Sequence, residues 1–402
     1  MGLIFKDDLH ERLGTWALGY IPYGGADFGE ILAVAAEVTP GDDSSFHDAW
    51  SAAADRLAAA AQQAEADRRL ASARELYLRA SGFYATAYHP LYGEPVDPRL
   101  LTGFRKQIAA FNAGLRLSDP PVAPTRIPFE ATTLPAYVIP AVTHPNEPRP
   151  LLILTNGYDA TVTDLYFASA VAASRRGYHC LIFDGPGQGE MLYEHGMRLR
   201  PDWETVVSAV VDHALTLPIV DPARIAIVGW SLGGYLAPRA ASGEHRLAAC
   251  VADPGLWSIA AGVRDFAIKL GATPEGVANL ASLDPALIDR MRHVVSGSRD
   301  LHWSVVRRGF WANGAADLAD YLRLIEAFTM EGRAQLIRCP TLLTRADGDP
   351  LGAQTESFYQ ALRCPRTLMP FHAAEGAGMH CEMMNRSLVN RRVLDWLDAV
   401  LQ

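Results

Sequence analysis

The sequence predicts an α/β protein: a mostly parallel eight-stranded sheet with helices on both faces, a helical domain before it and a helical insertion within it. From about residue 125, short β-rich runs alternate with helical stretches. That alternation is typical of parallel sheets whose two faces are covered by helices. Before residue 125 the apolar residues recur only at helical spacing. A chain of 402 residues has room for both parts.

Residues 1–124 are expected to form a helical N-terminal domain that serves as a cap or lid. Its helices are expected at 45–69, 70–84 and 99–115, where apolar residues follow a period of about 3.6. Ahead of them, residues 16–28 mix aromatic side chains with glycines. We interpret that segment as an ordered loop that lines a pocket.

Residues 125–402 are expected to form the second domain. Its strands are expected at 126–130, 135–139, 151–155, 179–184, 224–230, 248–252, 341–345 and 366–370. Its helices are expected at 162–174, 202–217, 232–241, 354–362 and 387–401. The stretch from about 255 to 333 breaks the alternation and has a helical pattern, so we expect an inserted cap there.

Composition and charge exclude several classes of protein. The chain has 36 Lys and Arg against 45 Asp and Glu, a net charge of −9 and a pI near 5.7, which argues against a nucleic-acid partner. The sequence has no apolar run of the roughly 18 residues that a membrane span needs. Its first residues lack the basic and apolar regions of a signal peptide. We therefore expect a cytoplasmic protein with neither nucleic-acid nor membrane partners.

The cysteines and histidines do not follow the pattern of a metal site or a disulfide framework. The five cysteines are scattered without a C-x-x-C pair, and the motif H-E-x-x-H is absent. The loop Asp184-Gly185-Pro186-Gly187-Gln188-Gly189 follows a strand, but it lacks G-x-G-x-x-G spacing and has a proline where a phosphate needs an N–H donor. We expect a tight turn in this loop, and no metal or cofactor.

A candidate nucleophile follows the fifth expected strand. The chain there reads Gly229-Trp230-Ser231-Leu232-Gly233 and continues as a helix. A serine between strand and helix, with a glycine two residues away on each side, fits a nucleophile elbow, because the turn leaves no room for side chains at those positions. The alternative is a plain strand–helix turn. The features described next favour a nucleophilic Ser231.

The base and the acid that such a serine needs are expected after the last two strands. The first of these strands is followed by two candidate acids, Asp347 and Asp349. We prefer Asp349, which lies deeper in the loop and precedes Pro350. The last strand is followed by two candidate bases, His372 and His380. We prefer His380, because its glycine-rich loop can bend back over the serine, whereas His372 closes the strand.

An oxyanion hole is expected from two backbone N–H groups. One belongs to Leu232, directly after the serine. The other is expected in the loop after the third strand, Thr155-Asn156-Gly157-Tyr158-Asp159. Gly157 lets the backbone approach a substrate, so we assign the second donor to Tyr158. The alternative for this loop is an ordinary β-turn.

These motifs resemble those of the α/β-hydrolase superfamily, and more narrowly a branch with a helical N-terminal domain. That branch includes 2,6-dihydroxypseudooxynicotine hydrolase and the fungal pigment hydrolases that shorten polyketide chains. The resemblance rests on residues 156–159, 184–189, 229–234 and 375–382. The chain order of serine, aspartate and histidine is also that of the superfamily. The resemblance implies a serine hydrolase without a cofactor, with its active site between the core and the helical domain.

The resemblance also implies cleavage of an ester, or of a carbon–carbon bond next to a ketone, in a small acyl substrate. One member of the branch is understood to use a further carboxylate after the sixth strand, and Asp253 and Asp265 are the acids nearest to that segment. Trp230 and Trp257 are further candidates for substrate contact. As pocket walls, the tryptophans of the insertion (Trp257, Trp303 and Trp311) would favour a bulky or aromatic substrate; the alternative is ordinary core.

Three other functions are compatible with the same motifs. A peptidase of the prolyl-oligopeptidase kind shares the triad but usually carries a β-propeller, and the sequence has no blade repeat. An acyltransferase or cyclase would keep the acyl-enzyme and exclude water. A non-catalytic binding protein would not need all three triad positions. We expect a small-molecule acyl substrate as the partner, and the N-terminal helical domain is a candidate homodimer surface.

Overall fold

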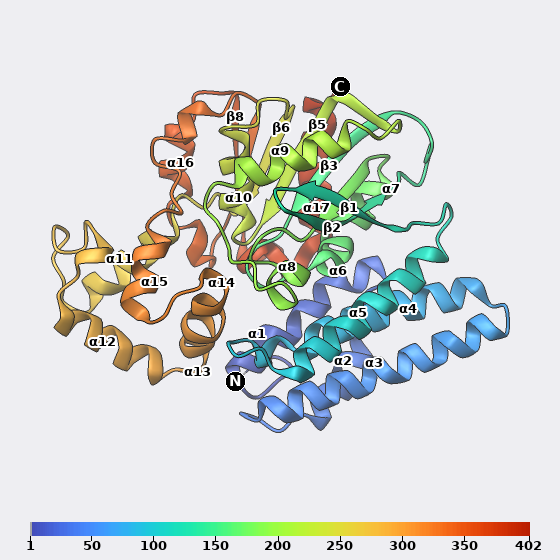
Figure 1. Ribbon diagram of the computed structural model, residues 1–402, viewed down its shortest axis with the longest axis horizontal. Helices are drawn as coiled ribbons and strands as arrows, with labels where there is room; N and C mark the ends of the chain where they lie inside the picture. The colour runs from blue at the N-terminus through green and yellow to red at the C-terminus, as the bar shows by residue number, and fades with distance from the viewer. Residues whose placement is uncertain (1) are drawn as a thin grey trace.

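Eight strands form one sheet in the computed structural model, which describes residues 2–402 (Figure 1). The strands are β1 (Pro124–Phe129), β2 (Thr132–Ile139), β3 (Arg149–Thr155), β4 (His179–Phe183), β5 (Val220–Trp230), β6 (Ala249–Asp253), β7 (Thr341–Ala346) and β8 (Arg366–Phe371). Their order in the sheet is β1-β2-β4-β3-β5-β6-β7-β8. β2 pairs antiparallel with both β1 and β4, and all other neighbours are parallel. The predicted mostly parallel sheet is confirmed.

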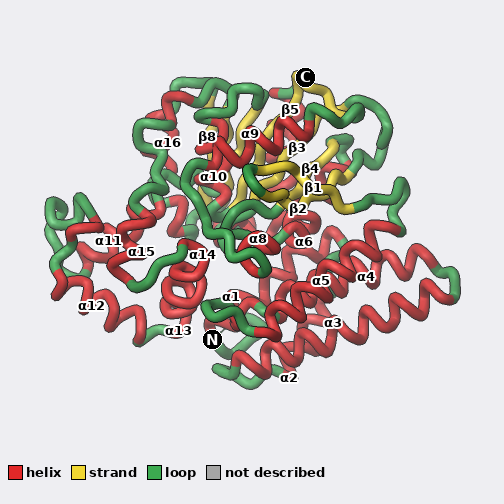
Figure 2. The backbone as a smooth tube through the Cα atoms, in the orientation of Figure 1, coloured by secondary structure: helices red, strands yellow, loops and turns green. Residues whose placement is uncertain are grey.

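Alternate side chains of the central strands contribute to two separate hydrophobic cores. Leu151 and Ile153 of β3 pack in the core that contains α9 and α10, whereas Leu152 and Leu154 pack in the core that contains α17. Both faces of the sheet are therefore covered by helices, as Figure 2 shows, and the strands β3, β4 and β6 are almost entirely buried. The helices of this part are α6 (Val162–Leu165), α7 (Val171–Arg175), α8 (Gly189–Tyr193), α9 (Trp203–Ala214), α10 (Gly233–Ala241), α16 (Thr355–Ala361) and α17 (Arg386–Val400). A π-helical segment, η3 (Tyr166–Ala170), joins α6 to α7.

The N-terminal part is helical, as predicted, and lies beside the sheet as the blue and cyan segments of Figure 1. It consists of α1 (Asp8–Gly14), η1 (Thr15–Tyr23), α2 (Phe28–Glu37), α3 (Asp43–Ala66), α4 (Leu70–Ala87), η2 (His89–Leu91) and α5 (Pro98–Arg116). Capping side chains set two of the helix starts: Asp42 accepts from the Ser44 and Ser45 N–H groups, and Asp97 accepts from that of Arg99. Most of the loop expected over 16–28 is instead the 3₁₀ helix η1, whereas residues 24–27 are non-helical and α2 begins at Phe28.

A helical insertion lies between β6 and β7, also as predicted, and has a small hydrophobic core of its own. It contains α11 (Ile259–Lys269), η4 (Leu280–Ser282), α12 (Pro285–Ser296), α13 (Arg299–Leu301), η5 (His302–Phe310), α14 (Trp311–Asn313), α15 (Leu318–Ile325) and η6 (Ala334–Leu336). The insertion docks on the N-terminal helices through Arg12, which pairs with Asp300 at 2.6 Å. Trp303 Nε1 also donates to the carbonyl oxygen of His89 at 2.8 Å. The three parts of the chain therefore meet on one side of the molecule (Figure 1).

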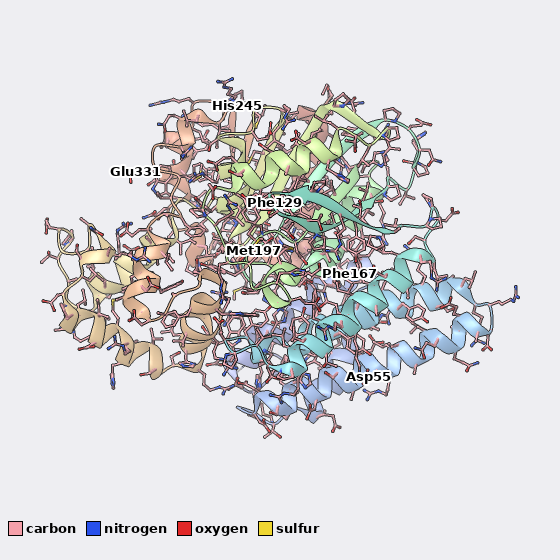
Figure 3. All side chains as sticks on the ribbon, viewed as in Figure 1. Asp55, Phe129, Phe167, Met197, His245 and Glu331 are labelled. Carbon is pink, nitrogen blue, oxygen red and sulfur yellow. The ribbon has the colours of Figure 1, made fainter. Side chains whose placement is uncertain are left out.

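The side chains separate into interior and periphery in the expected way. Figure 3 places Phe129 and Phe167 centrally, and both are buried. Asp55, His245 and Glu331 lie at the edges of the same view and are exposed. Of the helices within residues 2–402, none combines the length and the apolar character that a membrane span requires.

Candidate active site

Ser231 occupies the short turn between β5 and α10. Its φ is 58°, a left-handed conformation that non-glycine residues rarely adopt. The flanking glycines leave no room for a side chain: a Cβ on Gly229 would lie 2.0 Å from the Gly233 oxygen, and one on Gly234 would lie 2.0 Å from the Pro254 oxygen. This strained turn projects the serine hydroxyl away from the sheet, as a nucleophile elbow does.

The structure brings Ser231, His380 and Asp349 together in one hydrogen-bonded chain. His380 Nε2 lies 3.0 Å from Ser231 Oγ, and its Nδ1 lies 2.8 Å from Asp349 Oδ2. The Asp349 side chain is 1% exposed, whereas that of His380 is 30% exposed. A buried carboxylate on Nδ1 favours the tautomer with its proton there, which leaves Nε2 free to accept the serine proton.

The alternative acid and base pair with each other elsewhere. His372 Nδ1 lies 3.2 Å from Asp347 Oδ1, and both side chains are about half exposed. Asp347 also accepts from the N–H of Ala373 at 2.9 Å, which fixes the turn after β8. This pair stabilises a surface turn and makes no hydrogen bond to Ser231.

The loop after β3 lies against the nucleophile. A Cβ on Gly157 would lie 2.8 Å from Ser231 Cβ and 2.9 Å from the Leu232 nitrogen, so only glycine fits there. Within residues 2–402, neither the Leu232 nor the Tyr158 N–H donates a hydrogen bond to another group of the protein. Both of the expected oxyanion donors are therefore unpaired beside Ser231.

The turn after β4 is hydrogen-bonded to this loop. The Gln188 side-chain amide donates to the carbonyl oxygens of Asn156 and Gly157, at 2.9 and 3.0 Å. Its side-chain oxygen accepts from the N–H of Gly185, which closes the turn. The segment that resembled a dinucleotide loop thus holds the backbone that faces Ser231.

Asp253 is buried next to the backbone of Ser231 and does not face solvent. Its carbonyl oxygen accepts the Ser231 N–H at 2.7 Å, and its carboxylate accepts from Thr344 and Arg386 at 3.0 and 2.9 Å. The side chain is 3% exposed. Arg386 and Thr344 enclose the carboxylate, so its hydrogen bonds are made within the protein. Asp265 is exposed on α11 and makes no hydrogen bond to the triad.

Residues 151–391 of the chain match the Alpha/beta hydrolase family. The chain belongs to this family. Hydrolase LUC6 of Fusarium sp is 32% identical over 403 residues, which cover 95% of this chain and 94% of that protein. The 20-hydroxy-prefusarin hydrolase FUS2 of Gibberella moniliformis is 31% identical over 419 residues, which cover 99% and 98%. The crystal structure of the 2,6-dihydroxy-pseudo-oxynicotine hydrolase matches with a TM-score of 0.72 at 22% identity, over 95% of each chain.

These matches confirm the predicted resemblance, and the protein is a hydrolase of the alpha/beta hydrolase family. Within residues 2–402, no group of three or more His, Cys, Asp or Glu side chains is placed to hold a metal ion.

Aromatic side chains lie on one side of Ser231 and His380 in this alpha/beta hydrolase. Trp16 of η1 presents its ring 6.0 Å from the His380 ring and 5.4 Å from the Trp230 ring, edge to face in both cases. Trp230 is buried and donates to Asn156 Oδ1 at 3.0 Å. Trp257 is half-buried and packs on Phe358. The sequence indicated an aromatic segment at 16–28 but not that Trp16 would reach the histidine.

The other two tryptophans of the insertion belong to the core of the alpha/beta hydrolase. Trp303 stacks on Tyr92, and Trp311 stacks on Tyr193, with both indoles 2% exposed. Through Tyr92 and Tyr193 they join the N-terminal part, the insertion and α8. The tryptophans of the insertion were expected to be either pocket walls or ordinary core, and Trp303 and Trp311 are core residues.

The insertion and the N-terminal part of the alpha/beta hydrolase both contact the loop that bears Tyr158. Arg308 of η5 pairs with the Asp159 carboxylate at 2.8 Å and stacks over the Tyr158 ring at 4.7 Å. From the N-terminal part, the Tyr92 hydroxyl donates to the Asp159 carbonyl oxygen at 2.8 Å. No local sequence pattern indicates Arg308, because the ion pair joins positions 149 residues apart.

Proposed function

We propose that this alpha/beta hydrolase is a serine hydrolase that cleaves an ester, or a carbon–carbon bond next to a ketone, through an acyl-enzyme. Its proposed substrate is a small aromatic or polyketide-like molecule. The observation that supports the proposal most strongly is the continuous hydrogen-bonded chain from Ser231 Oγ through His380 to Asp349. The three side chains have the distances that proton transfer from a serine requires.

The reaction begins when His380 Nε2 takes the proton of the Ser231 hydroxyl. Oγ then forms a bond to the substrate carbonyl carbon, and the carbonyl oxygen becomes an oxyanion. The N–H groups of Leu232 and Tyr158 stabilise this oxygen, and each such donor typically contributes on the order of a hundredfold or more in rate. Asp349 stabilises the imidazolium of His380 without itself accepting the proton.

The intermediate collapses by breaking the bond to the leaving group. The leaving atom is an alcohol oxygen in an ester, or the carbon of an enolate in a ketone substrate, and it receives the proton held by His380. A water molecule, deprotonated in turn by His380, attacks the acyl-Ser231 and releases a carboxylic acid. The enolate leaves less readily than an alkoxide, so an electron-withdrawing ring in the substrate would assist it.

The proposed substrate class rests on two observations. Trp16 is partly exposed beside His380 and offers an aromatic surface to a bound acyl or aryl group. A relative at 31% identity, which covers nearly the whole chain, is named for the hydrolysis of 20-hydroxy-prefusarin. Both favour a small, largely apolar secondary metabolite.

The decisive test compares wild type with Ser231→Ala on p-nitrophenyl esters and on an aryl β-diketone. We expect turnover to be lost in the variant, since no other hydroxyl bonds His380. The exposed Ser282→Ala serves as the matched control and should retain wild-type rates. Activity of Ser231→Ala within tenfold of wild type would contradict the proposal.

The same assay separates the alternative functions. Hydrolysis of a peptide anilide in preference to the esters would favour a peptidase. An acyl-Ser231 that persists in water, detected by mass spectrometry, and is released only by an added alcohol or amine would favour an acyltransferase or cyclase. For the hydrolase we expect the acyl-enzyme to turn over in water alone.

A second test addresses the substrate surface. Replacing the ring in Trp16→Ala removes one aromatic contact, which is worth roughly tenfold in affinity. We expect kcat/KM to fall more for aryl esters than for alkyl esters of matched reactivity. An equal loss for both would indicate that Trp16 only supports His380.

A further inference from the structure

The turn that follows His380 is strained and lies in the interior. Cys381 and Glu382 both have left-handed backbones, with φ of 51° and 47°. Two consecutive non-glycine residues in this region persist only where tertiary contacts hold them. The turn presents His380 to Ser231, so whatever holds it also sets the position of the proposed base.

Arg386 and Asp253 supply part of that restraint. Arg386 Nη1 donates to the Cys381 carbonyl oxygen at 2.8 Å and to Asp253 Oδ2 at 2.9 Å. Asp253 in turn accepts the Ser231 N–H through its carbonyl oxygen at 2.7 Å. One buried network therefore joins the turn of the base to the turn of the nucleophile.

Glu382 lies in the same turn but, in the part of the chain that the structure describes, forms no ion pair, because Arg386 pairs with Asp253. It is 1% exposed, and within residues 2–402 no N–H or O–H group donates to either of its carboxyl oxygens. Of the charged groups around it, the Asp253 carboxylate raises the pKa of the Glu382 carboxyl most strongly. Two carboxylates only accept hydrogen bonds, so a contact between them requires a proton on one.

The charge balance leads to the same conclusion. The groups that face Glu382 are Asp253 at the end of β6, Asp349 after β7, the neighbouring Cys381, Arg386 of α17 and, facing Arg386, Tyr20 of η1. Arg386 is the single cation of this set, and Asp253 already occupies it. Burial, followed by the charge of Asp253, raises the pKa of the Glu382 carboxyl well above its ordinary value.

We propose that Glu382 is a positioning residue held as a neutral acid, whose hydroxyl donates to the Asp253 carboxylate and fixes the turn that presents His380 to Ser231. The proposal rests on the function proposed above for His380. A neutral Glu382 adds no second negative charge near Asp349. With Glu382 protonated, Asp349 alone acts on His380.

The first test measures urea unfolding between pH 5 and 9 for wild type, Glu382→Gln and the exposed control Glu331→Gln (Figure 3). A carboxyl whose pKa is raised by folding contributes stability that is present below its ordinary pKa and is lost as pH rises. The unfolding constant of wild type should therefore grow relative to Glu382→Gln by about tenfold per pH unit. A wild-type curve parallel to that of Glu382→Gln would overturn the proposal. This arm does not depend on catalysis.

A double-variant cycle tests whether the two carboxyls share the proton. Asp253→Asn leaves Glu382 free to ionise against Arg386, so it should remove the same pH dependence as Glu382→Gln. The double variant should add nothing further. Two separate and additive slopes would contradict a shared proton, because each carboxyl would then titrate alone.

The third test reads the reactivity of Ser231 through its rate of labelling by an alkyl fluorophosphonate. We expect Glu382→Gln to stay within about threefold of wild type at pH 7 and to lose less rate above pH 8. Glu382→Ala, which removes the tie to Asp253, should lose more than tenfold. Labelling in Glu382→Gln as slow as in Glu382→Ala would refute the neutral acid. If Ser231→Ala is labelled as fast as wild type, the proposed function fails instead, and unfolding still tests Glu382.

Discussion

The backbone of Gly157 lies so close to Ser231 that no residue with a side chain fits at position 157. The absence of a Cβ at Gly157 is what lets the loop after β3 present its N–H groups to the serine. Ser231 itself adopts a left-handed backbone, at a cost that the surrounding contacts must offset. At this scale we expect the reaction rate to depend on single groups, such as an added methyl group at Gly157 or the lost charge of Asp349.

Gly157→Ala should lower kcat by on the order of a hundredfold, because the new Cβ would displace either Ser231 or the oxyanion donors. KM should change much less. Steady-state kinetics on a p-nitrophenyl ester provide the measurement. Gly29→Ala, in open space on α2, is the control and should keep wild-type kcat. A kcat of Gly157→Ala close to wild type would place the oxyanion elsewhere.

Asp349→Asn should reduce kcat by on the order of a thousandfold or more, because an amide can hold His380 in the wrong tautomer and cannot stabilise its positive charge. The matched variant Asp347→Asn changes the neighbouring acid, which bonds His372 on the surface. It should stay within about threefold of wild type. The reverse order of effects would assign the acid to Asp347. Both rates are read at saturating substrate.

At the scale of the elements, three segments converge on the loop after β3. The turn before α8 holds it through Gln188, and the segment after η2 holds it through Tyr92. η5 reaches it with Arg308. η5 is a π-helix, a form that is often found at functional sites. The elements added to the sheet therefore hold the loop that carries Tyr158, the proposed oxyanion donor.

Arg308→Ala removes the ion pair to Asp159 and the stacking on Tyr158. We expect kcat to fall about ten- to a hundredfold while KM changes less than threefold, since a small displacement of a catalytic group has such effects. Arg323→Ala on α15, with an exposed ion pair to Asp320, should leave both constants unchanged. A change confined to KM would instead make Arg308 a substrate contact.

At the scale of the whole molecule, polar and aromatic contacts join the N-terminal part directly to the insertion. Arg12 pairs with Asp300, and Arg307 Nε donates to the Tyr92 carbonyl oxygen at 2.5 Å. The aromatic contacts of Tyr92 with Trp303 and Trp311 continue this junction into the interior. Stability and activity should therefore be lost together when buried groups near the junction change their charge.

Asp184 is a buried carboxyl through which pH should change the stability of the molecule. Burial raises the pKa of its carboxyl to about 8. Such a group contributes stability below the ordinary carboxyl value that is lost as pH rises towards 8, at up to about 1.4 kcal/mol per pH unit. We expect the free energy of unfolding of wild type to fall between pH 5 and 8 and that of Asp184→Asn to fall less. Asp289→Asn, changed at an exposed position, should follow wild type.

The fold was largely predictable because its signals are local. Apolar strands separated by helical stretches identify a parallel sheet wherever they occur, and the capping residues Asp42 and Asp97 set helix starts close to the expected ones. The error at 16–28 has a local cause as well. Glycines and aromatic residues favour a loop by propensity, but packing of η1 against the turn after His380 imposes a 3₁₀ helix.

The sequence by itself determined the strand–turn–helix at Ser231, because glycines two residues away on each side are required by the turn itself. Only the tertiary structure decided between Asp349 and Asp347, since both follow the same strand and differ only in which histidine they meet. It also placed Trp16 beside His380. These contacts join positions far apart in the chain, with Ser231 and His380 separated by 149 residues, so no local pattern records them.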